Sequence, residues 1–133
     1  MVAAVCGWHE CHGSASAAIE QRLAARQRLI TPAHAMVETY AVLTRLPAPH
    51  RLAPTEAWAL VKANFVDGRL LVVAPAATQV TTLGSLAQAG RGGERTYDAL
   101  IAATAARAGA AELLTFNPKH FDQVPPGLTI VAL

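Results

Sequence analysis

Short apolar runs alternate with longer segments of helical periodicity from one end of the sequence to the other. Strands are predicted where the apolar runs are short and continuous, at 28–30, 70–73, 112–116 and 128–132. Helices are predicted where apolar residues recur every three or four positions, at 14–26, 32–46, 54–65, 76–88 and 94–108. This alternation indicates an α/β fold, a three-layer α/β/α sandwich in which helices cover both faces of a short parallel sheet.

Local signals mark the ends of several predicted helices. Thr31-Pro32 predicts a helix start, because a hydroxyl at the N-cap and a proline at the first helical position both favour one. Pro47 stops that helix, and Gly109 is expected directly after the last long helix, where a left-handed backbone suits glycine. The chain opens inside what resembles a helix, although folds of this class normally open with a strand.

The composition is that of one folded domain. The chain has 133 residues, of which 53% are hydrophobic and 15% charged, so we expect a single domain over 1–133 and no extensive disorder. No apolar stretch is long enough to span a membrane, and the opening residues lack the basic lead of a signal peptide, so a cytoplasmic protein without membrane contact is expected. The net charge of +2 is compatible with a nucleic-acid ligand without establishing one.

One of the acidic residues, Glu38, lies in an otherwise apolar helical segment. The segment Ala35-Met36-Val37-Glu38-Thr39-Tyr40-Ala41-Val42-Leu43 places no cation three or four residues after this carboxylate. A surface pairing with His34, one turn earlier, explains Glu38 as well as a functional role does.

A second acidic residue, Asp98, stands directly before the most apolar helical run of the chain, 99–103. A helix cap or a pairing with Arg95 would also explain it. Glu94 lies one turn earlier, and like charges at this spacing repel each other unless a cation lies between them. Carboxylates that converge beside apolar helices suit Mg²⁺, which binds one or two carboxylates and keeps several waters.

A third polar element follows the predicted strand at 112–116. Thr115 and Asn117 offer a hydroxyl and an amide oxygen at the carboxyl end of that strand, the edge at which open parallel sheets bind ligands. Lys119 and His120 follow and are suited to a phosphate backbone. A simple turn is the alternative, because Asn-Pro is a common turn former.

These three elements resemble the motifs of VapC-type PIN-domain toxins. Residues 31–47 resemble the helix that carries the second acid of that family, and Tyr97-Asp98-Ala99-Leu100-Ile101-Ala102-Ala103-Thr104-Ala105 resembles the helix of the third acid. Thr115-Phe116-Asn117-Pro118-Lys119-His120-Phe121 is similar to the closing motif. The order and spacing agree over nearly the whole chain.

The resemblance implies a PIN-like fold and a metal-dependent endoribonuclease, the toxin of a type II toxin–antitoxin system. Glu38 and Asp98 would hold Mg²⁺, with Mn²⁺ as the alternative ion, and Asn117 would complete the catalytic set. Glu94 and Thr115 are accessory candidates. The implied partners are an RNA substrate, a cognate antitoxin whose Arg pairs with an acid of the site, and a second copy of the chain in a homodimer.

The first acid of the family pattern is not found in the sequence. Met1-Val2-Ala3-Ala4-Val5 matches the stretch that follows this acid, so the resemblance places the aspartate and its strand before Met1. A start assigned to an internal methionine is favoured over a truncation. If residues 1–133 are the complete chain, we predict poor metal binding and little nuclease activity, which a metal titration beside an upstream-extended form would test.

Other residues of the sequence raise three alternatives to a nuclease. Cys6, His9, Cys11 and His12 suggest zinc, but established sites place their two ligand pairs much farther apart. The absent aspartate and Asn117 are compatible with a PIN-like module that binds RNA or protein without cleavage. A phosphate loop at 90–93 is excluded, because no Lys-Ser/Thr follows it and no strand precedes it.

Overall fold

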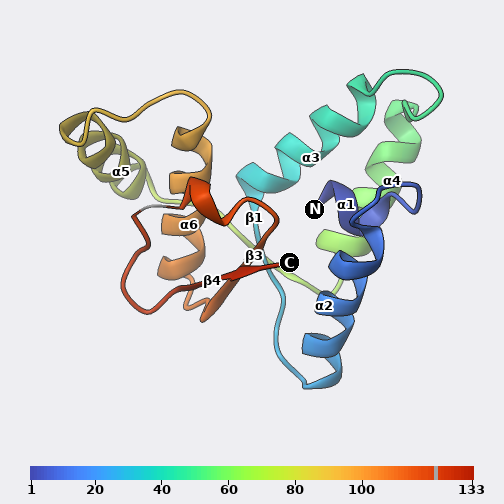
Figure 1. Cartoon of the computed structure of the whole chain (residues 1–133), viewed down its shortest axis with the longest axis horizontal. Coiled ribbons are helices and arrows are strands. Elements are labelled where there is room, and N and C mark those ends of the chain that lie inside the picture. Colours follow the sequence, from blue (N-terminus) through green and yellow to red (C-terminus); the bar gives the residue numbers. More distant parts are fainter. Residues whose placement is uncertain (122) are drawn as a thin grey trace. The chain divides into compact units, whose positions relative to one another are not determined.

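The computed structural model describes residues 1–121 and 123–133, and the chain divides into two compact units, 1–71 and 72–133. The first unit contains α1 (Val2–Val5), α2 (His12–Ala24), β1 (Ile30–Pro32), α3 (Ala33–Arg45) and α4 (Pro54–Phe65), and β2 (Leu70–Val72) begins at its end. The second unit contains α5 (Ala76–Gln88), α6 (Arg95–Arg107), β3 (Glu112–Thr115), the 3₁₀ turn η1 (Pro118–His120) and β4 (Thr129–Ala132) (Figure 1). Among the described residues, no helix has the length and apolar character needed to cross a membrane.

The core of the first unit lies between α3, α4 and α1. Leu43 of α3 and Val61 of α4 are fully buried, and they pack with Ala57 and Cys6. Ala57, Val61 and Phe65 recur every four residues, so they share the face of α4 that is buried. Burial of one such leucine or valine side chain contributes about 1.5–3 kcal/mol, which fixes α3 against α4.

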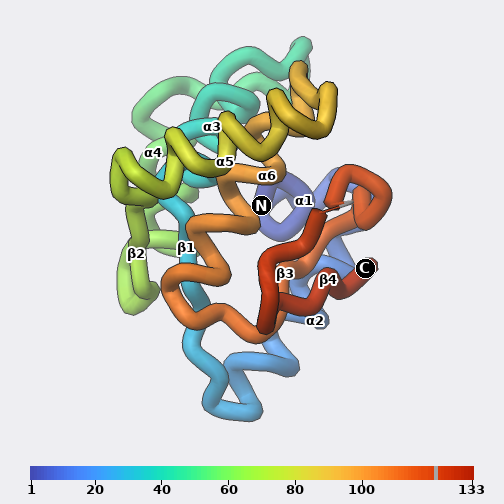
Figure 2. The backbone as a smooth tube through the Cα atoms, turned by 90° about the vertical axis from the view of Figure 1, so that its left-hand side faces the viewer, coloured from blue at the N-terminus to red at the C-terminus, as the bar shows by residue number. Residues whose placement is uncertain are grey.

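The second unit is built on a parallel pair of strands and two helices. β3 pairs with β4 in a register that sets Glu112 opposite Thr129 and Thr115 opposite Ala132. α5 packs on α6, as Figure 2 shows for the yellow and orange segments of the tube. Leu86 of α5 and Ala102 of α6 are buried in this unit. The paired strands hold the segment after β3 in a defined place.

Several element ends agree with the local signals. α4 and α5 have the predicted bounds, and the side chain of Glu56 accepts a hydrogen bond of 3.0 Å from the backbone N–H of Ala53 at the start of α4. Gly109 follows the C-cap Ala108 with a φ of +79°, the left-handed conformation expected there. The chain opens on the short helix α1, as its sequence indicated.

The expected cap at Thr31 is wrong. Thr31 lies inside β1 with 2% of its surface exposed, and the N-cap of α3 is Pro32, which has no side-chain hydrogen bond to the helix. The predicted strand at 28–30 is correspondingly displaced to 30–32. A β-branched side chain suits an extended, buried position, and this tertiary preference outweighs the capping propensity of threonine.

The sheet is shorter than the apolar runs suggested. The described strands form two two-stranded sheets, β1 with β2 and β3 with β4. The run at 70–73 is not a buried strand, because Leu71 is exposed and Val73 is 72% exposed. Among the described strands β2 pairs only with β1, so this strand is not enclosed between two neighbours. The apolar sequence of 70–73 therefore did not suffice to predict its burial. The α/β, PIN-like fold class itself is confirmed by the family match reported below.

Candidate acidic site

Asp98 is presented by the first turn of α6. This helix begins after the N-cap Glu94, and Asp98 is the acidic residue of its opening turn. The partial positive charge of a helix N-terminus favours a carboxylate at that place. The side chain of Asp98 is 27% exposed, so it is accessible while its backbone is held by the buried face of α6. The structure therefore supplies a partly shielded carboxylate at the position that the sequence singled out.

His120 contacts Asp98 from a distant part of the chain. Its Nδ1 lies 3.0 Å from Oδ2 of Asp98, although the two residues are 22 positions apart. His120 ends η1, which follows β3 by only two residues. The sequence assigns His120 to a phosphate backbone, and it offers a helix cap or a pairing with Arg95 as the alternative explanation of Asp98. No local spacing signals this pair, since it forms only when the end of β3 meets the start of α6.

Thr115 and Asn117 form a turn at the carboxyl end of β3. The backbone N–H of Asn117 donates a hydrogen bond of 3.0 Å to Oγ1 of Thr115. The hydroxyl oxygen of Thr115 thus stabilises the turn that the Asn-Pro alternative predicted. The side chain of Asn117 is exposed. The turn leads directly into η1 and so brings His120 to Asp98.

Glu38 lies in the second turn of α3 and is exposed. Its neighbour Thr39 is buried, and the hydroxyl of Thr39 donates a hydrogen bond of 2.7 Å to the carbonyl oxygen of Ala35, one turn earlier in the same helix. Burial lowers the pKa of the Met1 α-ammonium. The negative charges of the Glu38 carboxylate and, to a lesser extent, of a Cys6 thiolate act on this pKa in the opposite direction and raise it. The backbone nitrogen of Met1 therefore lies near Glu38.

The predicted site residues are distributed over both units. Asp98, Thr115, Asn117 and the N-cap Glu94 belong to the second unit, whereas Glu38 belongs to the first. Within the second unit the structure brings the third-acid helix and the closing motif together, through Asp98 and His120. Glu94 is exposed at the helix start, one turn before Asp98. Across residues 1–121 and 123–133, no group of three His, Cys, Asp or Glu side chains is assembled for a metal ion.

The candidate zinc ligands near the start of the chain are used in other ways. Cys6 is buried in the core of the first unit. Nδ1 of His9 accepts a hydrogen bond of 3.1 Å from the backbone N–H of Cys11, and Nδ1 of His12 lies 2.9 Å from the carbonyl oxygen of Ala3. These contacts stabilise the connection between α1 and α2, and they give no support to a zinc site.

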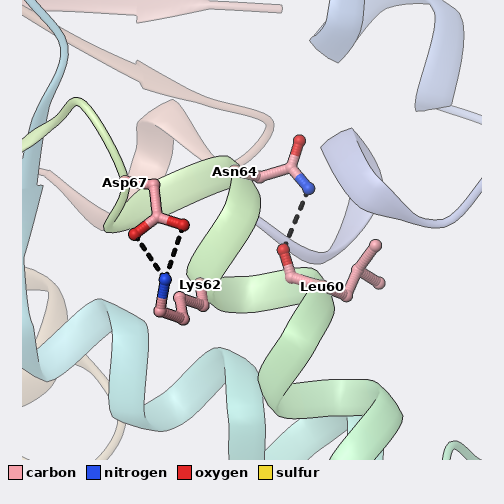
Figure 3. A network of polar contacts seen from close by, with 4 residues as sticks. All are labelled: Leu60, Lys62, Asn64 and Asp67. Carbon is pink, nitrogen blue, oxygen red and sulfur yellow. Dashed lines mark hydrogen bonds and ion pairs between the residues drawn. The ribbon is translucent and has the colours of Figure 1, made fainter.

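Asp67 is explained by a surface ion pair. Nζ of Lys62 lies 2.7 Å from both carboxylate oxygens of Asp67, and Nδ2 of Asn64 donates to the carbonyl oxygen of Leu60 at 2.9 Å (Figure 3). About half of each charged side chain is exposed. This pair lies directly after the end of α4 and accounts for Asp67 as a surface residue.

The sequence of residues 2–125 matches the PIN domain family. Ribonuclease VapC40 of Mycobacterium tuberculosis is 42% identical over 115 residues, which cover 86% of this chain and 79% of that protein. Ribonuclease VapC27 of Mycobacterium tuberculosis is 42% identical over 89 residues, which cover 67% of this chain and 62% of that protein. No solved structure matches the chain.

The chain belongs to the PIN-domain family. Within that family it is of the VapC type, because both relatives carry that name and the match to VapC40 covers most of either sequence. The family resemblance drawn from the three motifs is thereby confirmed.

Proposed function

We propose that this chain is a metal-dependent endoribonuclease, the toxin component of a type II toxin–antitoxin system, which hydrolyses RNA phosphodiester bonds. The observation that carries the proposal is the 42% identity to Ribonuclease VapC40 over 86% of the chain. The name of that relative supports cleavage of RNA over binding without cleavage. Because the family match runs through both units, we also propose that residues 1–133 form one PIN-like domain in the cytoplasm.

The proposed catalytic residues are Glu38, Asp98 and Asn117, and the two carboxylates hold the cation. The donor chemistry fits a hard divalent ion, since Glu38 is exposed and Asp98 partly exposed, and carboxylate oxygens are the ligands that Mg²⁺ prefers. Mn²⁺ accepts the same donors. When bound, the cation would stabilise the charge that develops on the attacking and leaving oxygens of the phosphodiester.

The remaining residues of the proposed site act through polar contacts. Asn117 offers a neutral amide at a position that is often an aspartate in the family, so the site carries less negative charge here. Thr115 already accepts the N–H of Asn117, which leaves its own O–H to donate to a water or a phosphate oxygen. Glu94, exposed at the N-cap of α6, is an accessory acid that adds negative charge beside Asp98.

The proposed partners are RNA, a cognate antitoxin and a second copy of the chain. An antitoxin arginine paired with Glu38 or Asp98 would occupy the carboxylates, and Arg–carboxylate pairs are strong and geometrically specific. The support for the antitoxin and for the homodimer is the membership in the VapC type.

The test replaces each proposed metal ligand with its neutral isostere. Glu38→Gln and Asp98→Asn are expected to lower RNA cleavage by at least about 100-fold, because a cation site contributes several kcal/mol of charge stabilisation. Glu20→Gln in α2, also an exposed helical glutamate of the first unit, is the matched control and should keep full activity.

Two readouts are measured for each protein, cleavage of a labelled RNA with and without a chelator, and Mn²⁺ binding by electron paramagnetic resonance. Mn²⁺ binding is measured beside cleavage because it reports on the proposed metal ligands directly. Full Mn²⁺ affinity in both variants would refute the metal site. RNA that binds tightly but is cut by none of the proteins, with Mg²⁺ or Mn²⁺ present, would favour a binding module instead.

A further inference from the structure

The contact between His120 and Asp98 joins two elements whose backbones are both fixed. His120 is held by η1, where its backbone N–H donates to the carbonyl oxygen of Asn117 at 3.0 Å. That turn follows β3, which is paired with β4 along its whole length. Asp98 is held by α6, whose buried face packs within the same unit. The separation of 3.0 Å between Nδ1 and Oδ2 is therefore set by the fold of the second unit.

A hydrogen bond to one oxygen of a carboxylate orients the other oxygen. Asp98 is 27% exposed, so without a partner its carboxylate would be free to rotate toward water. A donor that occupies Oδ2 defines the plane of the group and leaves Oδ1 for a ligand. Carboxylates that bind metals are usually hydrogen-bonded in this way, and loss of such a partner typically weakens metal binding by about 10- to 100-fold.

We propose that His120 is a positioning residue for Asp98. Nδ1 of His120 donates a hydrogen bond to Oδ2 of Asp98 and thereby directs Oδ1 of Asp98 toward the divalent cation. The inference rests on the proposed function, since it assigns Asp98 to the cation. The donor must be Nδ1, so the imidazole carries its proton there, and a neutral ring suffices. His120 itself touches neither the cation nor the substrate.

The rival role for His120 is a direct contact with an RNA phosphate. The side chain of His120 is 40% exposed and lines a small hollow together with Arg91 and Arg95, so cationic groups stand nearby. A phosphate contact would have to use Nε2, because Nδ1 is engaged with Asp98. The two roles thus depend on different nitrogen atoms of the ring, and substitutions can separate them.

His120→Asn and His120→Phe make this separation. The amide nitrogen of asparagine takes the place of Nδ1 and can donate to Oδ2, but no group replaces Nε2. Phenylalanine keeps the shape of the ring and offers no donor. We expect His120→Phe to weaken Mn²⁺ binding by about 10- to 100-fold, and His120→Asn to stay close to the unchanged protein.

The measurements are Mn²⁺ titrations by electron paramagnetic resonance, together with kcat and KM for a labelled RNA. Equal Mn²⁺ affinity in His120→Phe and the unchanged protein would overturn the proposal, as would an equal loss in both variants. A raised KM in both variants with unchanged Mn²⁺ affinity would also overturn it and assign His120 to the phosphate. Asp98→Asn distinguishes a failure of the proposed metal site from a failure of the role of His120. Unchanged Mn²⁺ affinity in Asp98→Asn would refute the metal site itself.

A second readout needs neither metal nor activity. In the metal-free protein, nuclear magnetic resonance is expected to show a proton on Nδ1 of His120 that exchanges slowly with water, and Asp98→Asn should alter its shift and speed its exchange. A proton on Nε2 in place of Nδ1 would refute the hydrogen bond. The partial exposure of His120 makes unfolding of its variants unexpected, and circular dichroism verifies this for each one.

Discussion

The position of Glu38 depends on the packing of α3, and Leu43→Ala tests that packing. Leu43 lies five residues after Glu38 on the same helix and has no exposed surface. It packs with Cys6, Ala57 and Val61, and its removal would leave these side chains facing a void. The substitution therefore measures how firmly the helix that carries the proposed second acid is held.

The expected loss follows from the carbon atoms removed. Leucine to alanine deletes three buried carbons, and at about 0.8 kcal/mol each the transfer contribution is about 2.4 kcal/mol. A residual cavity adds about 24 cal/mol per Å³. Ala57 and Cys6 are too small to fill the space by changing rotamer, so we expect the free energy of unfolding to fall by about 3–4 kcal/mol.

The assay is urea unfolding followed by tryptophan fluorescence. Both tryptophans, Trp8 and Trp58, lie in the first unit, so their fluorescence reports on the packing around Leu43. Val37→Ala in α3 is the control in the same unit, because Val37 is 61% exposed and its truncation should cost less than about 0.5 kcal/mol there. A loss below about 1 kcal/mol for Leu43→Ala, or equal losses for both variants, would refute the described core.

Two further predictions concern charge. Lys62→Ala removes the ion pair with Asp67, and because both side chains are about half exposed the free energy of unfolding should fall by less than about 1 kcal/mol, with a smaller effect at high salt. A loss of more than about 2 kcal/mol in a urea titration would contradict this. Burial raises the pKa of the Cys6 thiol, so its stabilising contribution is complete below the thiol pKa of the unfolded chain and is lost as the pH rises through the higher pKa of the folded protein. Cys6→Ala should therefore reduce the fall in the free energy of unfolding at alkaline pH, measured by urea titrations over a series of pH values. An unchanged dependence of this free energy on pH would contradict the prediction.

Much of the secondary structure could be predicted because its signals are local. Pro54 opens α4, and Gly109 takes the left-handed conformation after α6, since both depend on backbone preferences of single residues. Asn117-Pro118 offers a turn as the alternative to a ligand site, and the structure has a turn there, in which the backbone N–H of Asn117 donates to Oγ1 of Thr115. The motifs at 31–47, 97–105 and 115–121 were sufficient to indicate the family, which the comparisons confirm.

Other features were decided by contacts between segments far apart in the sequence. Thr31 had the propensity of a helix cap, yet its place beside β2 made it a buried strand residue. Asp98 is singled out by its apolar surroundings, and the sequence offers Arg95 as its partner, whereas its contact with His120 is not indicated by any local spacing. His120 reaches it only because β4 holds β3 in parallel register and the turn at Asn117 then directs the chain toward α6. Local preferences act over a few residues, whereas a pair 22 positions apart exists only once the strands and the helix have packed.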